Sequence, residues 1–294
     1  MDTKPKYQYQ ADIEDLIQSD PKLASLPGIY YEFKNAVQDP DLNFDGIEKI
    51  ILKDTHLTAH LLKIVNSAFY SFSPKIETIS HAASVIGTEQ LGYLVLSTVV
   101  MDKFQEIPEN VISMNSFWRH SIACGLVSKK LAEYKGEPNS EKYFIAGLLH
   151  DIGRLVMCMN LPNRNWEILV RSNFTNEALH LTEAQELGFD HAQLGGALLR
   201  HWNLPEVYQE VVEYHHNPNQ APRFPDEVAH SHLADIIANT LKLGCSGESL
   251  IVPKLEERAW IKARPPQNIS LAVIKGEVEE VFEETARAFL HHPH

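Results

Sequence analysis

The chain has 294 residues, enough for one large domain or two ordinary ones, and 44% of them are hydrophobic and 22% charged. This is the composition of an ordinary globular protein, and it excludes a disordered or low-complexity chain. The net charge of −13, with no block rich in lysine or arginine, argues against binding to a nucleic-acid polymer or to an anionic membrane.

The first part of the chain is predicted to form a lead-in and a helical lobe. Apolar residues recur at the i, i+3, i+4 and i+7 spacing of amphipathic helices, and no long alternating Val/Ile/Thr run is present. We expect a lead-in over residues 1–25 and an N-terminal lobe over 26–110. Helices of this lobe are expected to end near Asp39 and to cover 44–53, 55–68, 80–86 and 89–104.

A second lobe is predicted over residues 111–243, after a joint formed by the proline and polar residues of 105–115. Asp190 and Gln193 have the spacing of a capping box. Beyond the lobe, residues 244–294 form a C-terminal extension that is irregular at first and ends in a helix over 271–290. The helices of the second lobe are expected at 116–135, 140–159, 190–202, 205–216 and 226–243.

Cysteine usage and hydropathy predict a cytoplasmic protein. Cys124, Cys158 and Cys245 are odd in number and far apart, which argues against a disulfide framework. The first sixteen residues contain no apolar signal core. The longest apolar stretch, residues 91–101, is too short to cross a bilayer, which takes about 20 apolar residues.

The segment FIAGLLHDIGRLVMCM, residues 144–159, contains an unusual pair. It is hydrophobic nearly all round, which is typical of a buried helix, yet it carries His150 and Asp151 at its middle. Burying a carboxylate without a partner costs several kcal/mol. A cationic or hydrogen-bonding group is therefore expected to meet Asp151.

Other histidines and one aspartate are predicted to face the same interior. Taken alone, an inward histidine is more often a hydrogen-bonded core residue than a metal ligand, so buried polar packing is the alternative interpretation. Together, imidazole nitrogens and carboxylate oxygens suit Zn, Fe, Mn, Co or Ni. A central carboxylate can also bridge two ions that activate water against a phosphoester. The inward positions are His120, His191, His215, the adjacent His216, and Asp235 in the stretch HLADIIA.

These positions resemble the H…HD…D pattern of the HD superfamily of metal-dependent phosphohydrolases, at His120, His150-Asp151 and Asp235. The first lobe resembles the HDOD family, the regulatory branch of that superfamily in bacteria, in stretches such as LPGIYYEFKNAVQDPDLNF and ETISHAASVIGTEQLGYLVLSTVV. The resemblance covers about residues 26–244. It implies an all-α, compact multi-helix HDOD fold with an HD-type metal-binding lobe, and a role in bacterial signal transduction.

The chain also resembles the HD-GYP cyclic-dinucleotide phosphodiesterases. The H-x-x-x-G of that family is matched by His191 with Gly195, and its double histidine by His215-His216. In that family these residues bind a second metal beside the bridging aspartate, which here is Asp151. The resemblance thus implies one or two divalent metal ions, of Fe, Mn, Zn, Ni or Co. The implied metal ligands are His120, His150, Asp151, His191, His215, His216 and Asp235.

Three departures from that family concern the substrate. Arg154 replaces the lysine of HD-x-G-K, which keeps the charge but changes its reach and geometry. Asn217 replaces the acidic residue expected after the double histidine, and NPNQAPRFP stands where the Gly-Tyr-Pro signature would be. The resemblance makes Asp151 and Arg154 the expected catalytic residues of an active enzyme, but it does not specify cyclic-di-GMP as the substrate.

Two functions remain open at this point. The first is a regulatory binding module, in which metal ties helices together and the surface contacts signalling proteins or a small phosphorylated or nucleotide ligand. The second is a metal-dependent phosphohydrolase or cyclic-dinucleotide phosphodiesterase that uses metal-activated water. A weaker third interpretation is a nucleotide phosphohydrolase that acts on deoxynucleotides. We expect no fused signalling domain in these residues and leave open a homodimer formed through 244–294.

Overall fold

The computed structural model describes residues 13–39, 43–247 and 252–290. These residues are helices, turns and loops without any strand, so the predicted all-α class is confirmed. They form two compact units, one of 26–105 with 276–290 and one of 13–25 with 106–275. The predicted extension is thus divided between the two units. Part of the predicted lead-in, and the histidines of 291–294, lie outside the described residues.

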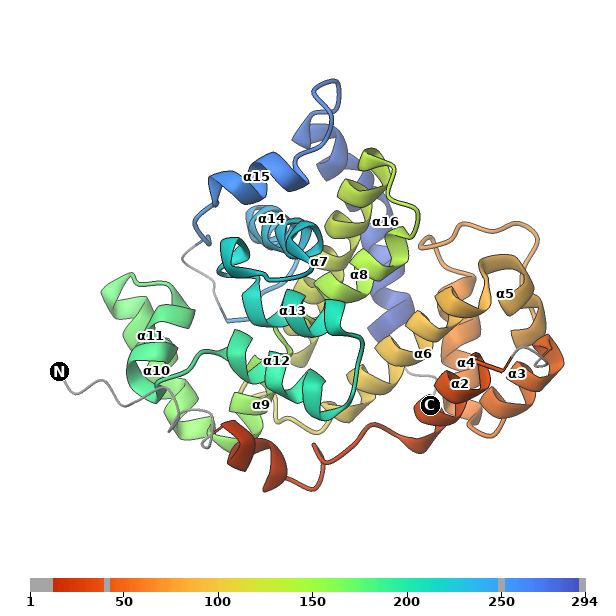
Figure 1. The fold of residues 1–294 in the computed structure, drawn as a ribbon, viewed down its shortest axis with the longest axis horizontal. Helices are drawn as coiled ribbons and strands as arrows, with labels where there is room; N and C mark the ends of the chain where they lie inside the picture. The colour runs from red at the N-terminus through yellow and green to blue at the C-terminus, as the bar shows by residue number, and fades with distance from the viewer. Residues whose placement is uncertain (1–12, 40–42, 248–251, 291–294) are drawn as a thin grey trace. The chain divides into compact units, whose positions relative to one another are not determined.

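The unit of residues 26–105 contains short helices in the places predicted for the first lobe. Asn43, Asp54 and Thr78 each cap a helix by accepting a hydrogen bond from the backbone N–H three residues on. His60 joins the last helix of the chain to this unit, because its Nε2 lies 3.1 Å from the carbonyl oxygen of Ala288. The helices are α2 (Gly28–Ala36), α3 (Phe44–Ile51), α4 (Thr55–Val65), α5 (Ile79–Ile86), α6 (Thr88–Lys103) and most of α16 (Leu271–Leu290) (Figure 1).

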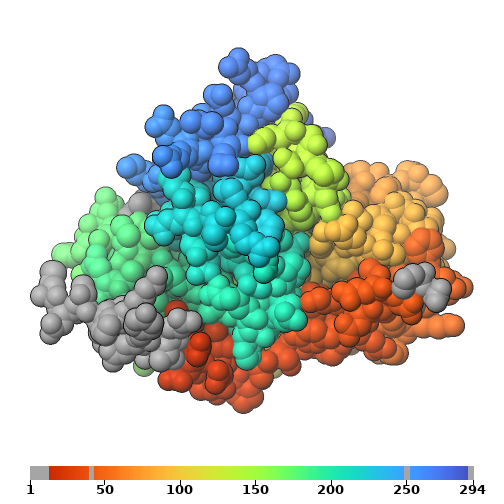
Figure 2. All heavy atoms as spheres, in the orientation of Figure 1, coloured from red at the N-terminus to blue at the C-terminus, as the bar shows by residue number. Residues whose placement is uncertain are grey.

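The unit of residues 106–275 is built around α7 (Met114–Lys135), which packs on α8 (Ser140–Leu149) and on α14 (Pro225–Leu241). A second layer is formed by α12 (His191–His201), which packs on α9 (Ile152–Asn160) and on α13 (Glu206–Tyr214). In the space-filling view the side chains of α13 and α14 form one continuous face (Figure 2). The remaining helices are α10 (Pro162–Thr175), α11 (Leu179–Leu187), α15 (Glu257–Ala263) and the 3-10 turn Pro218–Gln220.

The structure corrects the predicted helix over 140–159. The chain leaves the helix at Asp151, whose backbone has φ −97° and ψ 9°, so that α8 ends and α9 begins beside the His-Asp pair. Two further helices, α10 and α11, lie between α9 and α12, where the prediction included none. α15 lies in a segment predicted to be irregular, since its seven residues are too few to show a period.

Local signals set the ends of the helices around the site. The predicted capping box of α12 is present, because Asp190 accepts from the backbone of Gln193 and the Gln193 side chain accepts from the backbone of Asp190. Ser113 caps α7, because its side chain accepts a hydrogen bond from the backbone N–H of Ser116. Trp202, which follows α12, donates from Nε1 to the carbonyl of Leu23 at 2.8 Å. This bond connects residues 13–25 to the unit that holds the site.

Membrane-spanning potential is low in the described helices. None of them alone is both long enough and apolar enough to cross a bilayer. Only α5 and α6 taken together reach the length and composition needed, and the pair bends by 118° at Gly87.

Candidate metal centre

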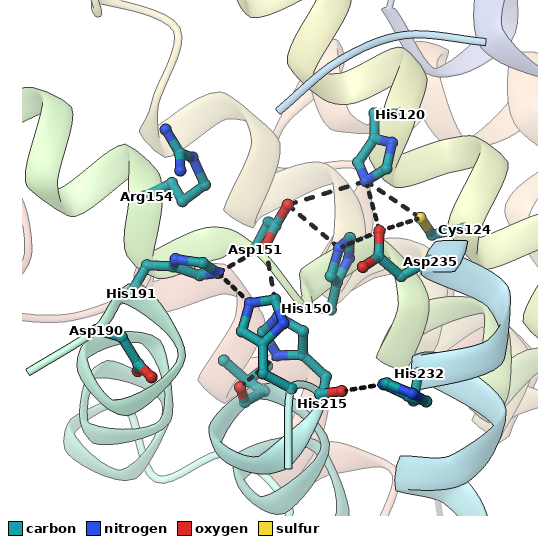
Figure 3. Close-up of polar contacts among 12 residues, drawn as sticks. His120, Cys124, His150, Asp151, Arg154, Asp190, His191, His215, His232 and Asp235 are labelled. Carbon is teal, nitrogen blue, oxygen red and sulfur yellow. Dashed lines mark hydrogen bonds and ion pairs between the residues drawn. The ribbon is translucent and has the colours of Figure 1, made fainter. Parts of the chain in front are cut away.

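The seven predicted metal ligands converge in the interior of the unit of residues 106–275, and all of them except His216 are labelled in Figure 3. They come from α7, from the break between α8 and α9, from the start of α12, from the end of α13 and from α14. Each of these side chains is buried, with an exposed fraction of 9% or less. Side chains separated by more than a hundred residues in sequence are therefore held within reach of one ion.

The break between α8 and α9 allows His150 and Asp151 to serve the same centre. Neighbouring residues in a regular helix point about 100° apart, so an unbroken helix would turn one of them away. His150 donates from Nδ1 to the carbonyl of Gly147 at 2.7 Å. This bond fixes the ring and leaves Nε2 as the atom that faces the carboxylates.

The first group of potential ligands, cluster A, consists of His120, Cys124, His150 and Asp235. The Nε2 atom of His120 lies 3.1 Å from Oδ1 of Asp235, and Nε2 of His150 lies 3.6 Å from the same oxygen. Asn239 donates to that oxygen at 2.8 Å and so orients the Asp235 carboxylate. All four ligand atoms lie within 4.8 Å of one another.

The second group, cluster B, consists of Asp151, His191, His215 and His216. The Nε2 atoms of His191 and His215 lie 3.1 and 3.6 Å from Oδ1 of Asp151. His216 Nε2 lies 2.9 Å from His191 Nε2. His215 donates from Nδ1 to the carbonyl of Val212 at 2.8 Å, which directs its Nε2 towards the cluster.

Asp151 connects the two clusters. Its Oδ2 lies 3.2 Å from Nε2 of His150 and 3.9 Å from Nε2 of His120, both in cluster A. Its Oδ1 faces His191 and His215 in cluster B. A carboxylate whose two oxygens face two ligand groups is the arrangement expected of a bridge between two ions.

The backbones of α9 and α12 approach closely beside Asp151, and two glycines make this approach possible. A Cβ atom on Gly153 would clash with the carbonyl oxygen of His191 and lie 2.6 Å from the backbone nitrogen of Gly195. The contact places the start of α12, and with it His191, against Asp151. It gives the H-x-x-x-G spacing of His191 and Gly195 a physical reason in this chain.

Glu183 of α11 supports His191 from behind. Its Oε2 accepts from Nδ1 of His191 at 2.5 Å and from the His191 backbone at 2.9 Å, and its Oε1 lies 3.3 Å from Arg154. Arg154 and Glu183 are both fully buried. The structure thus brings Arg154 to Glu183 and not to the carboxylates of the clusters, and in Figure 3 its guanidinium points away from Asp151.

The electrostatics of the centre are those of a site built for cations. Burial raises the pKa of Asp151, but the neighbouring His150, His191 and His215 outweigh it and hold that pKa well below its usual range. Burial lowers the pKa of His150, but Asp151 and Asp235 outweigh it and raise the pKa to about 10. In the absence of metal, protons on these histidines supply the positive charge that a bound metal ion would supply.

The donor set fits a divalent metal. The Nε2 atoms of His150 and His215 are buried, have no hydrogen-bond partner and face carboxylate oxygens. Imidazoles whose other nitrogen donates to a carbonyl or carboxylate are the usual metal-ligating form. The residues of clusters A and B are therefore able to hold metal.

Four residues that the sequence reasoning did not assign to the site belong to its surroundings. Cys124, considered in the sequence only for disulfides, lies in cluster A. Glu183 could have been found in the sequence, because it lies between Leu179 and Leu187 at the four-residue spacing of one helix face. A carboxylate buried on such a face needs a partner. His232 donates from Nδ1 to the carbonyl of His215 at 2.7 Å, and His180 stacks on His216 with ring centroids 4.0 Å apart.

Fold and ligand cluster together define an all-helical protein with a buried His/Asp centre able to hold metal. Comparison with protein families matches residues 23–218, more than half of the chain, to the HDOD domain. The chain therefore belongs to the HDOD family. The predicted family resemblance and the predicted compact multi-helix HDOD fold are confirmed.

An uncharacterized protein of Treponema pallidum is 28% identical over 214 residues, which are 72% of this chain and 40% of that protein. The chain thus spans less than half the length of that relative.

Solved structures of low identity share the fold. An HDOD domain protein of unknown function from Geobacter sulfurreducens is 23% identical with a TM-score of 0.77, over 97% of this chain and 98% of that one. A protein of Shewanella amazonensis provisionally named a phosphohydrolase is 20% identical with a TM-score of 0.74, over 95% and 98%. A protein of Marinobacter aquaeolei provisionally named a signal transduction protein is 15% identical with a TM-score of 0.70, over 99% and 67%.

Proposed function

We propose that this chain is a bacterial, cytoplasmic signal-transduction protein whose His/Asp centre holds one or two divalent metal ions and which acts mainly as a regulatory binding module. The metal ties together helices that come from distant parts of the sequence, so that its binding free energy is also free energy of folding. The family assignment and the fold shared with a provisionally named signal transduction protein support this proposal.

The observation that carries the regulatory role is the burial of the centre. The ligand side chains expose at most 9% of their surface, and Asp151 and Asp235, which would hold the ions, expose 4% each. Arg154, one of the two expected catalytic residues, is fully buried and paired with Glu183. A substrate phosphate would need these groups at a surface, whereas a structural or regulatory ion does not.

The proposed partners are signalling proteins or a small phosphorylated or nucleotide ligand, with a homodimer as a further possibility for residues 252–290. The net charge of −13 supports partners other than nucleic-acid polymers or anionic membranes. The metal is proposed to be Fe, Mn, Zn, Ni or Co, since mixed imidazole and carboxylate sites bind all of these ions.

A second candidate function is a metal-dependent phosphohydrolase, and the position of Asp151 favours it. Its two oxygens face two separate ligand groups, as in centres that hold two ions. When bound, such ions polarise phosphoryl oxygens and activate water. The contribution of this chain would be to fix the geometry, since Glu183 holds the tautomer of His191 and Gly147 holds that of His150.

One experiment separates the two functions. The protein is loaded with Mn, Fe or Zn, its metal content per chain is measured, and hydrolysis of cyclic dinucleotides, nucleotides and a chromogenic phosphodiester is assayed against Asp151→Ala. For a regulatory module we expect bound metal, a raised melting temperature, and hydrolysis no faster than in Asp151→Ala. Hydrolysis that the loaded wild type shows and the variant lacks would transfer the assignment to the phosphohydrolase.

A further inference from the structure

We infer that Cys124 is a further protein ligand of the ion in cluster A, beside His120, His150, Asp235 and the bridging Asp151, so that this cluster prefers zinc or another thiophilic ion. The inference rests on the proposed metal centre. It adds a ligand that lies outside the H…HD…D pattern of the chain. It also makes clusters A and B chemically different, because cluster B offers only nitrogen and oxygen atoms.

The position of the sulfur is that of a ligand. Cys124 lies one helical turn after His120 on α7, and its Sγ is 3.4 Å from Nε2 of His120 and 3.9 Å from Oδ1 of Asp235. For a tetrahedral zinc with bonds of about 2.0–2.2 Å to nitrogen and oxygen and about 2.3 Å to sulfur, the ligand atoms lie about 3.3–3.6 Å apart.

The measured separations in cluster A bracket this range. They are 3.1 and 3.6 Å from the two imidazoles to Asp235, 3.4 Å from His120 to the sulfur, and 3.9 Å from the sulfur to Asp235. Four donor atoms from three separate segments thus lie within 4.8 Å of one another, and the separations to Asp235 and from His120 to the sulfur are close to those of ligands on one ion. Figure 3 shows His120, Cys124 and Asp235 directed towards one another, with the sulfur beside the carboxylate.

The close crossing of α7 and α8 holds Cys124 in this position. A Cβ atom on Gly147 would lie 2.8 Å from the backbone carbonyl carbon and oxygen of Cys124, so only glycine permits the contact. The carbonyl of the same Gly147 accepts the Nδ1 hydrogen of His150. One contact between two helices therefore positions both the sulfur and an imidazole of cluster A.

A hydrogen-bonded thiol accounts for the cluster less well. A thiol can donate its single hydrogen to Asp235 and accept one from His120, but both are weak hydrogen bonds, and the contact with Asp235 is 3.9 Å long. The Nε2 atom of His150, buried in the same cluster, has no hydrogen-bond partner, and the thiol does not supply one. An ion bound to all four atoms satisfies each of them at once.

The added thiolate changes the charge and the openness of the site. Thiolate and Asp235 together balance the charge of a divalent ion, and with the two imidazoles and the bridging Asp151 they would leave the ion no open position. Closed four-coordinate sites with cysteine are typical of structural zinc, whereas catalytic sites keep an open position. Cluster A would thus hold the fold together. Replacement of a softer metal ion by a harder one would be confined to cluster B, which has no sulfur ligand.

Cobalt substitution tests the inference through absorption spectroscopy. The protein carries His291, His292 and His294 replaced by alanine, so that the terminal histidines do not bind the metal. Co²⁺ is titrated into metal-free protein, and the near-ultraviolet sulfur-to-cobalt charge-transfer band is recorded together with the visible d–d bands. We expect one charge-transfer band that saturates with the first ion, disappears in Cys124→Ala and persists in the control Cys245→Ala.

The chain offers a second route if Cys124→Ala does not fold. Because the protein has only three cysteines, the double variant Cys158→Ala/Cys245→Ala leaves Cys124 as the sole thiol, and the band must remain in it. We also expect Cys124→Ala to lower the affinity for Zn²⁺ at least about tenfold and to leave that for Mn²⁺ nearly unchanged.

The possible results separate this inference from the proposed function. Visible d–d bands without a sulfur band, or a band that persists in Cys124→Ala, would overturn the assignment of Cys124 and leave the metal centre in place. Absence of cobalt uptake by the parent protein would overturn the proposed centre, and the inference with it.

Discussion

Replacing Glu183 by glutamine tests how the buried network supports the metal centre. The substitution keeps the shape of the side chain but removes the negative charge that Arg154 and His191 share at 3.3 and 2.5 Å. All three side chains are fully buried, and loss of one partner of a buried ion pair costs about 3–5 kcal/mol. Since about 1 kcal/mol shifts the melting temperature of such a protein by about 2–4 °C, we expect a fall of about 6–20 °C.

The assay is thermal unfolding by circular dichroism, with and without metal, together with metal titrations. The affinity for metal is expected to fall about 10–100-fold, because Glu183 orients His191. Glu186→Gln on the same helix is the matched control, since its arginine partners are nearly half exposed and such surface pairs contribute about 1 kcal/mol or less. A melting temperature of Glu183→Gln equal to that of Glu186→Gln would refute the assignment of the network.

Three other predictions concern the centre and its scaffold. Asp151→Ala is expected to lose bound metal and to melt at a lower temperature, and full metal content with an unchanged melting temperature would show the site assignment to be wrong. In metal-free protein the pKa of His150 is raised to about 10, against 6.5 for an ordinary histidine. The ion pairs of His150 therefore stabilise the fold fully below pH 6.5, and this stabilisation is lost as the pH rises to 10. Urea unfolding across that range measures the loss. Metal uptake near pH 7 should release about three protons per chain, from His150, His191 and the Cys124 thiol, and calorimetry in buffers of different ionisation enthalpy counts them. Gly153→Ala is expected to disrupt the crossing of α9 and α12 and abolish metal binding, whereas Gly276→Ala, where a Cβ meets nothing within 4 Å, should stabilise α16 by about 0.5–1 kcal/mol, as measured by chemical denaturation.

The sequence was sufficient to predict the helical class and the convergence of the ligands. Helical periodicity placed His120, His215 and Asp235 on inward faces, and the buried charge of Asp151 required partners that the structure supplies. The capping box at Asp190 set the start of α12, and with it the position of His191. These signals are local, so a single sequence reveals them.

Other features depend on tertiary contacts that no local pattern reveals. The predicted continuous helix over 140–159 has uniform hydrophobicity, which gives no sign that the chain leaves the helix at Asp151. Arg154 was expected to be a catalytic residue, but it lies against Glu183, which α11 brings from another part of the chain. The nearness of the Cys124 sulfur to Asp235 likewise depends on how α7 and α14 pack.

The convergence of ligands from distant segments has a consequence for how the protein responds to its surroundings. An ion held by the proposed centre joins residue 120 to residue 235, and in chain-entropy terms a cross-link that closes a loop of about 100 residues is worth about 4.7 kcal/mol. Unlike a disulfide, this cross-link can be removed by a chelator or by scarcity of the ion. The fraction of folded molecules would then rise and fall with the concentration of free metal. The half-life of the protein against proteolysis would change in the same direction.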